Sequence, residues 1–297
     1  MFCITDRPSL LHRLLPLPLV IVALFCFTGC LTFEVLIKVN PDGTGTVERS
    51  FIITNQMIRM AFMFGGDDGE PVALCDAEED LLEQADAMGE GVELLSVERV
   101  QNEGELGCRT IFTFTDINTL RVSFDPETQM PKELMDDEEE TLYQQETDPD
   151  ETVYVTFRHD PDDPPTLVTM LNQQYMFGGE AGEDMEENPF DDLLAMDSTQ
   201  RAMQLQMMRE MTKDGFLTLA LEVENDIAET NATYHEGNRI TLFEMDFYKL
   251  FESEEKLLQL QRIANANPQS ADELKALIDS IDGFSLETLE EVHVPLE

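Results

Sequence analysis

Methionine side chains recur at helical spacing in two segments of this chain, and thioether clusters of this kind have three uses. They fill irregular gaps in a core, they form an adaptable apolar surface, or in exported proteins they bind Cu(I). The spacing favours core packing first, an apolar groove for a ligand or a partner second, and copper last. The candidate groove residues are Met57, Met60, Phe62 and Met63 in one segment and Met203, Met207, Met208 and Met211 in the other.

Motifs of known enzyme classes do not occur in the sequence. It contains no GxSxG nucleophile elbow, no HExxH pair and no P-loop. His159, His235 and His293 are scattered, and none stands four residues from another histidine as in a zinc motif. Because 62 acidic residues place carboxylates near one another throughout the chain, no glycosidase-like dyad can be singled out. The sequence predicts no catalytic residue, no metal site, no cofactor and no enzyme activity.

The first residues of the chain have the charge and hydropathy pattern of a secretory signal. Arg7 and Arg13 precede an apolar run over residues 14–27, which is shorter than the about 20 residues that a membrane-spanning helix needs. The small pair Thr28-Gly29 then precedes Cys30, as a signal peptidase requires. We therefore expect residues 1–29 to be removed, with a signal anchor or a buried strand as the alternative.

The stretch Phe27-Thr28-Gly29-Cys30 resembles the lipobox of bacterial lipoproteins. In that family the cysteine thiol receives diacylglycerol, the preceding peptide is removed, and the new amino terminus is acylated by a fatty acid such as palmitate. Phe27 stands where the family usually has leucine or another aliphatic residue. The resemblance implies that Cys30 is lipidated, and that the protein is exported and anchored to the cell membrane or the outer membrane.

Export would leave Cys75 and Cys108 as the only thiols without another role, because Cys3 and Cys26 lie in the signal. An oxidising compartment allows such a pair to form a disulfide. Cys75 opens a helix-like segment and Cys108 enters a predicted strand, so the bond would join helix to sheet. A metal site is the alternative, but neither cysteine has a neighbouring histidine.

The formal net charge of −44 is far outside the magnitude of roughly 2–8 that small soluble domains carry. Such a charge repels nucleic acid, and the sequence has no basic stripe, so we expect no nucleic-acid partner. It also repels anionic lipid head groups, so acyl chains would have to hold the protein to a membrane. Adaptation to high salt explains the acidity better than an acidic binding role, because the carboxylates are spread along the chain.

Alternating apolar and polar residues predict a β-hairpin over residues 31–54, with turn chemistry in the segment NPDGTG. Apolar residues at helical spacing predict a helix over 76–88. Residues 92–100 and 109–115 predict a second hairpin. Residues 30–125 therefore form a predicted ββαββ unit.

The remainder divides by composition into an acidic linker over residues 126–150, a mixed region over 151–252 and a C-terminal region of helices and a last strand over 253–297. The mixed region holds a β-meander and a flexible acidic loop near 176–197, and it could share one sheet with the first unit. The predicted fold class is α+β, an antiparallel sheet built from hairpins with packed helices and acidic disordered insertions. The elements expected here are strands near 153–157, 216–224, 228–234, 240–246 and 292–296, and helices over 167–174, 198–212 and 270–281.

The segments VNPDGTGTVERSF, FTFTDINTLR and, later, IAETNATY and GNRITLFEMD resemble the LppM-like group of bacterial lipoproteins. These are turn and strand patterns, and no binding residue can be carried over from them. The resemblance implies a membrane-anchored α+β domain for which lipid or glycolipid binding has been suggested.

Two functions of different classes follow from these observations. The first is a lipid-anchored binding module that takes a lipid or an envelope protein in the apolar groove defined above. The second is a structural envelope lipoprotein without a small-molecule ligand, whose acidity is salt adaptation. The oligomeric state is left open by the sequence.

Overall fold

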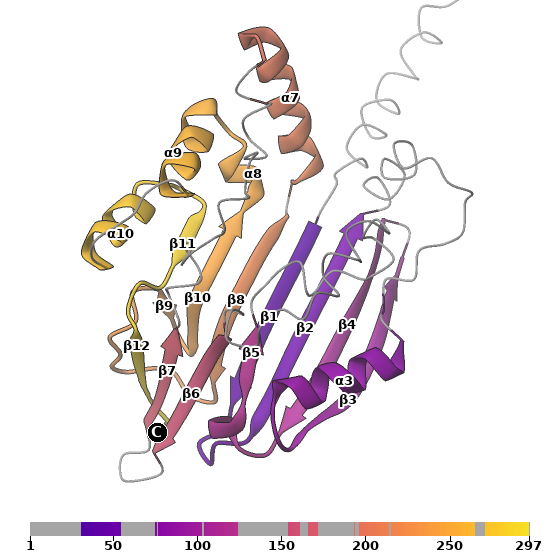
Figure 1. The fold of residues 1–297 in the computed structure, drawn as a ribbon, viewed down its shortest axis with the longest axis vertical. Helices are drawn as coiled ribbons and strands as arrows, with labels where there is room; N and C mark the ends of the chain where they lie inside the picture. Colours follow the sequence, from indigo (N-terminus) through magenta and orange to yellow (C-terminus); the bar gives the residue numbers. More distant parts are fainter. Residues whose placement is uncertain are drawn as a thin grey trace, which may run out of the picture.

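The computed structural model describes residues 31–54, 75, 77–102, 104–123, 154–160, 166–171, 193, 196–213, 215–264 and 271–296, and it contains two β-sheets and several helices (Figure 1). The strands are β1 (Leu31–Val39), β2 (Gly45–Thr54), β3 (Val92–Gln101), β4 (Glu105–Phe114), β5 (Arg121–Ser123), β6 (Tyr154–Asp160), β7 (Thr166–Leu171), β8 (Phe216–Val223), β9 (His235–Glu236), β10 (Arg239–Asp246), β11 (Phe284–Leu286) and β12 (Glu291–Pro295). The helices are α3 (Glu78–Met88), η2 (Ile117–Thr119), α7 (Ser198–Met211), α8 (Phe247–Leu250), α9 (Glu254–Ala264) and α10 (Ala271–Ile278).

The larger sheet has eight strands in the order β11–β10–β8–β1–β2–β4–β3, with β9 paired to β10. Neighbouring strands in this sheet are antiparallel, except that β1 and β8 run parallel, with Thr32 opposite Phe216. The four strands of the predicted ββαββ unit and the later strands β8, β9, β10 and β11 therefore share one sheet, joined at the β1–β8 pair. This architecture confirms the α+β class.

The β1–β2 hairpin forms as the sequence predicts because its turn residues satisfy their own backbone. The Asp42 carboxylate accepts hydrogen bonds from the backbone N–H and the hydroxyl of Thr44, at 3.0 and 2.7 Å. The hydroxyl hydrogen bond is the main reason why the pKa of Asp42 lies below its usual value. Gly43 adopts φ +82°, in the left-handed region where a side chain is strained.

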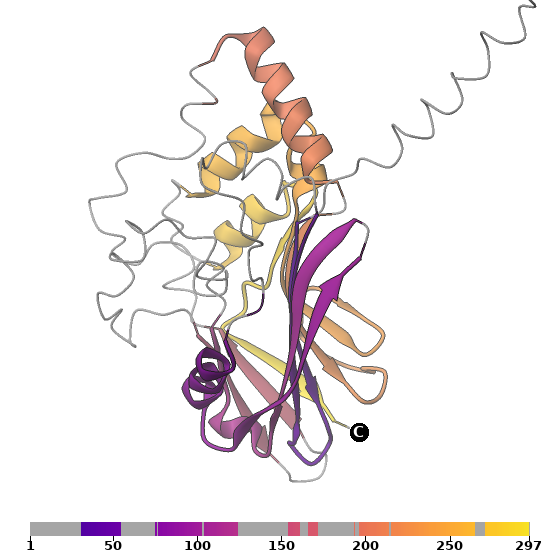
Figure 2. The same cartoon turned by 90° about the vertical axis from the view of Figure 1, so that its right-hand side faces the viewer.

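The smaller sheet has four strands in the order β12–β7–β6–β5 and packs on one face of the larger one. Figure 2 shows the smaller sheet on the same side of the larger sheet as α3, α9 and α10. Apolar side chains from both sheets form one continuous core, in which Val35, Leu219, Phe112, Leu167 and Val292 are fully buried. The pleat turns alternate residues of β1, such as Glu34, to the opposite face.

The helix predicted over residues 167–174 is wrong, because the segment 166–171 is strand β7. It pairs with β6 on one side and β12 on the other, with Thr169 opposite both Phe157 and Val292. Leu167 and Val168 are both buried, so consecutive residues lie on the two covered faces of the strand. A short apolar run shows neither the helical nor the strand period of hydrophobic residues. The elements that pack against it therefore decide whether it forms a helix or a strand.

The strand predicted over residues 228–234 is also wrong, and regular pairing in this region is limited to His235 and Glu236 of β9. Side chains attach the segment instead. The Asn231 amide donates to the Glu291 carbonyl at 2.9 Å and accepts from the His293 N–H at 2.7 Å. Asn231 thus binds the backbone of β12 in place of a further strand.

A fully buried carboxylate, that of Glu287, also holds the segment 228–234 in place. Glu287 accepts hydrogen bonds from the backbone N–H and hydroxyl of Thr233, at 2.6 and 3.1 Å, and from the N–H groups of Thr288 and Leu289, at 2.9 and 3.1 Å. Four donors compensate the loss of water around the charge, which is the condition for burying it.

Candidate functional site

Several of the sequence-predicted site residues lie outside the described residues. Cys30, Met57, Met60, Phe62 and Met63 belong to this group, and so do the predicted acidic insertions near 126–150 and 176–192. Met211 is the last residue of α7.

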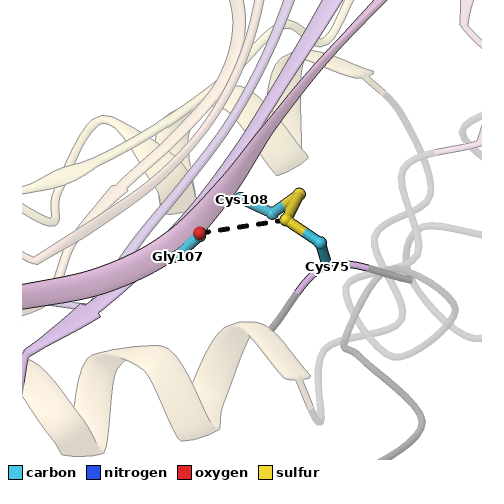
Figure 3. The surroundings of a disulfide bond; sticks show 3 residues. All are labelled: Cys75, Gly107 and Cys108. Atoms are coloured by element: carbon cyan, nitrogen blue, oxygen red, sulfur yellow. Dashed lines mark hydrogen bonds between the residues drawn. A yellow bond between two sulfur atoms is a disulfide. The ribbon is translucent and has the colours of Figure 1, made fainter. Parts of the chain in front are cut away.

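Cys75, three residues before the start of α3, and Cys108 in β4 are joined by a disulfide (Figure 3). Their Cα atoms are 5.1 Å apart, inside the limit of about 7 Å for bridging without backbone movement. Both cysteines are buried, and the Cys75 sulfur lies 4.0 Å from the Gly107 carbonyl oxygen. The bond ties the chain that enters α3 to the sheet and leaves neither thiol free for a metal.

Helix α7 separates its methionines between two surfaces. Met203 and Met207, one helical turn apart, are 68% and 46% exposed, whereas Met208 packs against a small cluster. That cluster consists of Leu193, Leu205, Phe251 and Leu257. The described α7 methionines therefore do not line one common groove, because the helical period points Met208 inward.

The start and the orientation of α7 follow from its polar residues. Asp197 caps the helix by accepting from the N–H groups of Thr199 and Gln200, at 2.9 and 3.1 Å. Arg201 pairs with Glu254 at the start of α9, and Arg209 stacks over the Tyr248 ring at 4.3 Å from its centroid. These contacts hold α7 against α8 and α9.

An open pocket of about 360 Å³ lies on the face of the larger sheet turned away from the smaller sheet. Glu34, Thr218 and Glu244 stand side by side on β1, β8 and β10 at its floor. The remaining lining residues are Gly215, Phe216, Arg239, Asp246 and Tyr248. Phe216 stands opposite Thr32, so the pocket opens near the end of the sheet where β1 begins.

The charges of the pocket are partly neutralised within it. Arg239 donates to Glu34 at 3.1 Å, and Asp246 accepts from the backbone N–H and the ammonium group of Lys249, at 3.1 and 3.3 Å. Among its described lining residues there is no histidine, cysteine or serine. The arrangement offers hydrogen-bond acceptors and two aromatic rings to a ligand.

Within the described part of the chain, no three His, Cys, Asp or Glu side chains come together as a metal site would require. No helix among the described residues has both the length and the apolar content needed to cross a bilayer.

Comparison with known proteins gives no family model that matches this chain and no matching curated protein. Among solved structures, the chain is similar to the folded domain of LppM from Mycobacterium tuberculosis, determined by NMR. The identity is 12%, the match covers 72% of this chain and 82% of that domain, and the TM-score is 0.27. The class of this protein therefore rests on its own fold, which is an α+β arrangement of two packed sheets with a disulfide between β4 and the segment before α3.

Proposed function

We propose that this chain is a lipid-anchored, non-enzymatic envelope protein that presents a binding domain directly at the membrane surface. The observation that carries the proposal is the position of β1, which begins at Leu31, the residue after Cys30. Acylation of Cys30 would therefore leave no linker between the lipid and the sheet. Each buried methylene of an acyl chain contributes roughly 0.8 kcal/mol, and two or more chains give stable anchoring.

The ligand that we propose is a lipid or an envelope protein, bound at the anchor end of the sheet. The open pocket and the exposed methionines of α7 both support this assignment. The pocket is lined by Phe216 at the start of β8, and α7 ends a few residues before it. Because β8 runs parallel to β1, both features lie near the residue where the anchor would be attached.

Substitution of the anchor residue tests the proposed attachment. We expect Cys30→Ser to move the full-length protein from the membrane fraction to the soluble or precursor fraction, because the thiol that accepts the lipid is gone. Membrane fractionation after a high-salt wash, with mass spectrometry of the amino-terminal peptide, measures the change. Cys3→Ser serves as the matched control, because it makes the same substitution at a cysteine that is neither the anchor nor part of the disulfide. Continued membrane association of Cys30→Ser would refute the proposal.

A structural role without a ligand is the second candidate, and the pairing within the pocket favours it. Glu34 is engaged by Arg239, and Asp246 by Lys249, so these carboxylates already have partners. Native mass spectrometry of protein extracted from its own membrane distinguishes the candidates. A lipid or protein that travels with the wild type supports the binding module, and an unloaded chain supports the structural role.

The high negative charge leads to a prediction about salt. Repulsion among spread carboxylates is screened over about 10 Å at 0.1 M salt and about 3 Å at 1 M, so we expect the melting temperature to rise smoothly with NaCl. A specific calcium site would instead saturate at low concentration. Calorimetry in increasing NaCl, and with sub-millimolar Ca²⁺ at matched ionic strength, separates the two. A sharp stabilisation by micromolar Ca²⁺ would show that the acidity serves binding.

A further inference from the structure

Helix α7 lies beyond the end of the larger sheet at which β1 and β8 both begin. Thr32 pairs with Phe216 near the first residues of the two strands, and α7 ends shortly before β8. Figure 1 shows the helix projecting past this end of the sheet, away from the β1–β2 turn. A lipid attached at Cys30 would therefore place the bilayer on the side from which α7 projects.

The outer surface of α7 carries few charges. Among the α7 side chains whose exposure the structure describes, Glu210 is the single exposed charge. The other exposed residues of the helix are Ser198, Thr199, Gln200, Ala202, Met203, Gln206 and Met207. Helix α3, by contrast, has Glu78, Glu79 and Asp80 in its first turn. Because carboxylates are repelled by anionic head groups, an uncharged surface is the one that can approach a membrane.

The cations of α7 are used in attaching it to the body of the protein. Arg201 is paired with Glu254, and Arg209 covers the ring of Tyr248. Leu205 and Met208 face the small cluster on the same inner side. The helix is thus fixed in one orientation, which directs Met203 and Met207 outward together.

We propose that α7 rests on the bilayer that holds the anchor, with Met203 and Met207 in the interfacial region of the lipid. This inference deepens the proposed function and rests on its anchor at Cys30. Two methionines bury too little apolar surface to bind a bilayer alone, whereas a tethered domain meets the surface at high effective concentration. The contact brings the end of the sheet where β1 begins, and with it the open pocket, toward the lipid surface.

Because the chain contains no tryptophan, single substitutions supply a clean optical probe. We choose Met203→Trp and Met207→Trp in the full-length protein, reconstituted in phosphatidylcholine vesicles that carry bromine on their acyl chains. Leu82→Trp is the matched control, because Leu82 is a 50% exposed apolar residue of α3, which Figure 1 places toward the other end of the sheet. We expect a blue-shifted emission and several-fold stronger quenching for the α7 probes than for the control.

Flotation of the vesicles reports the anchor separately from the docking of α7. A protein that floats while its α7 probes are quenched no more than the control would overturn the docking and leave the anchor intact. A protein that does not float would refute the anchor. In that case the protein would be attached to the vesicles chemically, by a maleimide lipid. The maleimide would react with Cys3, Cys26 or Cys30, because Cys75 and Cys108 are bonded to each other and have no free thiol. Every such tether lies ahead of β1, so quenching of the α7 probes, or its absence, still decides the docking.

Discussion

Replacing Cys75 and Cys108 together by alanine is expected to lower the free energy of unfolding by about 3–4 kcal/mol, which corresponds to a drop in Tm of about 10 °C. The bond closes a loop with a sequence separation of 33 residues, which contains α3, β3 and the first part of β4. Closing such a loop removes conformations from the unfolded chain, and a loop of this length costs the unfolded state several kcal/mol of entropy.

Urea denaturation of the oxidised wild type and the double variant measures this difference. The reduced wild type is the matched control, because it breaks the same bond without removing side-chain atoms from the core. The thioether expected at Cys30 is not cleaved by a reducing agent, so reduction acts on the disulfide. If the oxidised and reduced proteins unfold at the same urea concentration, the bond contributes nothing to the stability of the fold.

Substitution of Glu287 by alanine is expected to lower the free energy of unfolding by about 3 kcal/mol. The change removes the acceptor of four hydrogen bonds and leaves the N–H groups of Thr233, Thr288 and Leu289 without it. Glu287→Gln should lower the free energy of unfolding by less. Its amide oxygen can replace Oε1 and keep the hydrogen bonds from the Thr233 hydroxyl and the N–H groups of Thr288 and Leu289, while its NH₂ group faces the Thr233 N–H.

Glu290→Ala is the matched control, because Glu290 is an exposed acid in the same connection, and we expect its effect to stay within about 0.5 kcal/mol. Chemical denaturation gives the free energies, and hydrogen exchange of residues 228–234 shows whether that segment detaches first. A Glu287→Ala protein within 1 kcal/mol of the wild type would mean that water replaces the carboxylate at little cost.

Some elements could be predicted correctly from the residues of one continuous segment. The hairpin of β1 and β2 carries both its alternation and its turn residues, such as Asp42 and Gly43, within one continuous segment. Helix α7 likewise has its cap at Asp197 and a helical spacing of apolar residues. The last strand was predicted in the same way from alternating Val292 and Val294. For the hairpin and for α7 the deciding interactions are between residues close in sequence, whereas the last strand shows its alternation locally but pairs with β7.

Short apolar segments were decided by partners distant in sequence. The run that forms β7 was predicted as a helix, yet Thr169 lies between β6 and β12 in a ladder that no local pattern specifies. Asn231 and its neighbours alternate like a strand but bind β12 through side chains. The competing conformations differ little in local free energy, so the available hydrogen-bond partners select between them.

Local patterns in the residues were enough to predict the β1–β2 hairpin, the signal-like start, the candidate lipid attachment at Cys30 and the acidity. The parallel pairing of β1 with β8, and with it the pocket at Glu34, Thr218 and Glu244, is a property of the folded chain alone. The tertiary structure also decided that Met208 turns inward while Met203 and Met207 turn outward, and that Glu287 is buried with its four donors. Each of these features depends on which surfaces come into contact when the chain folds. The partners are distant in sequence, so no local pattern specifies them.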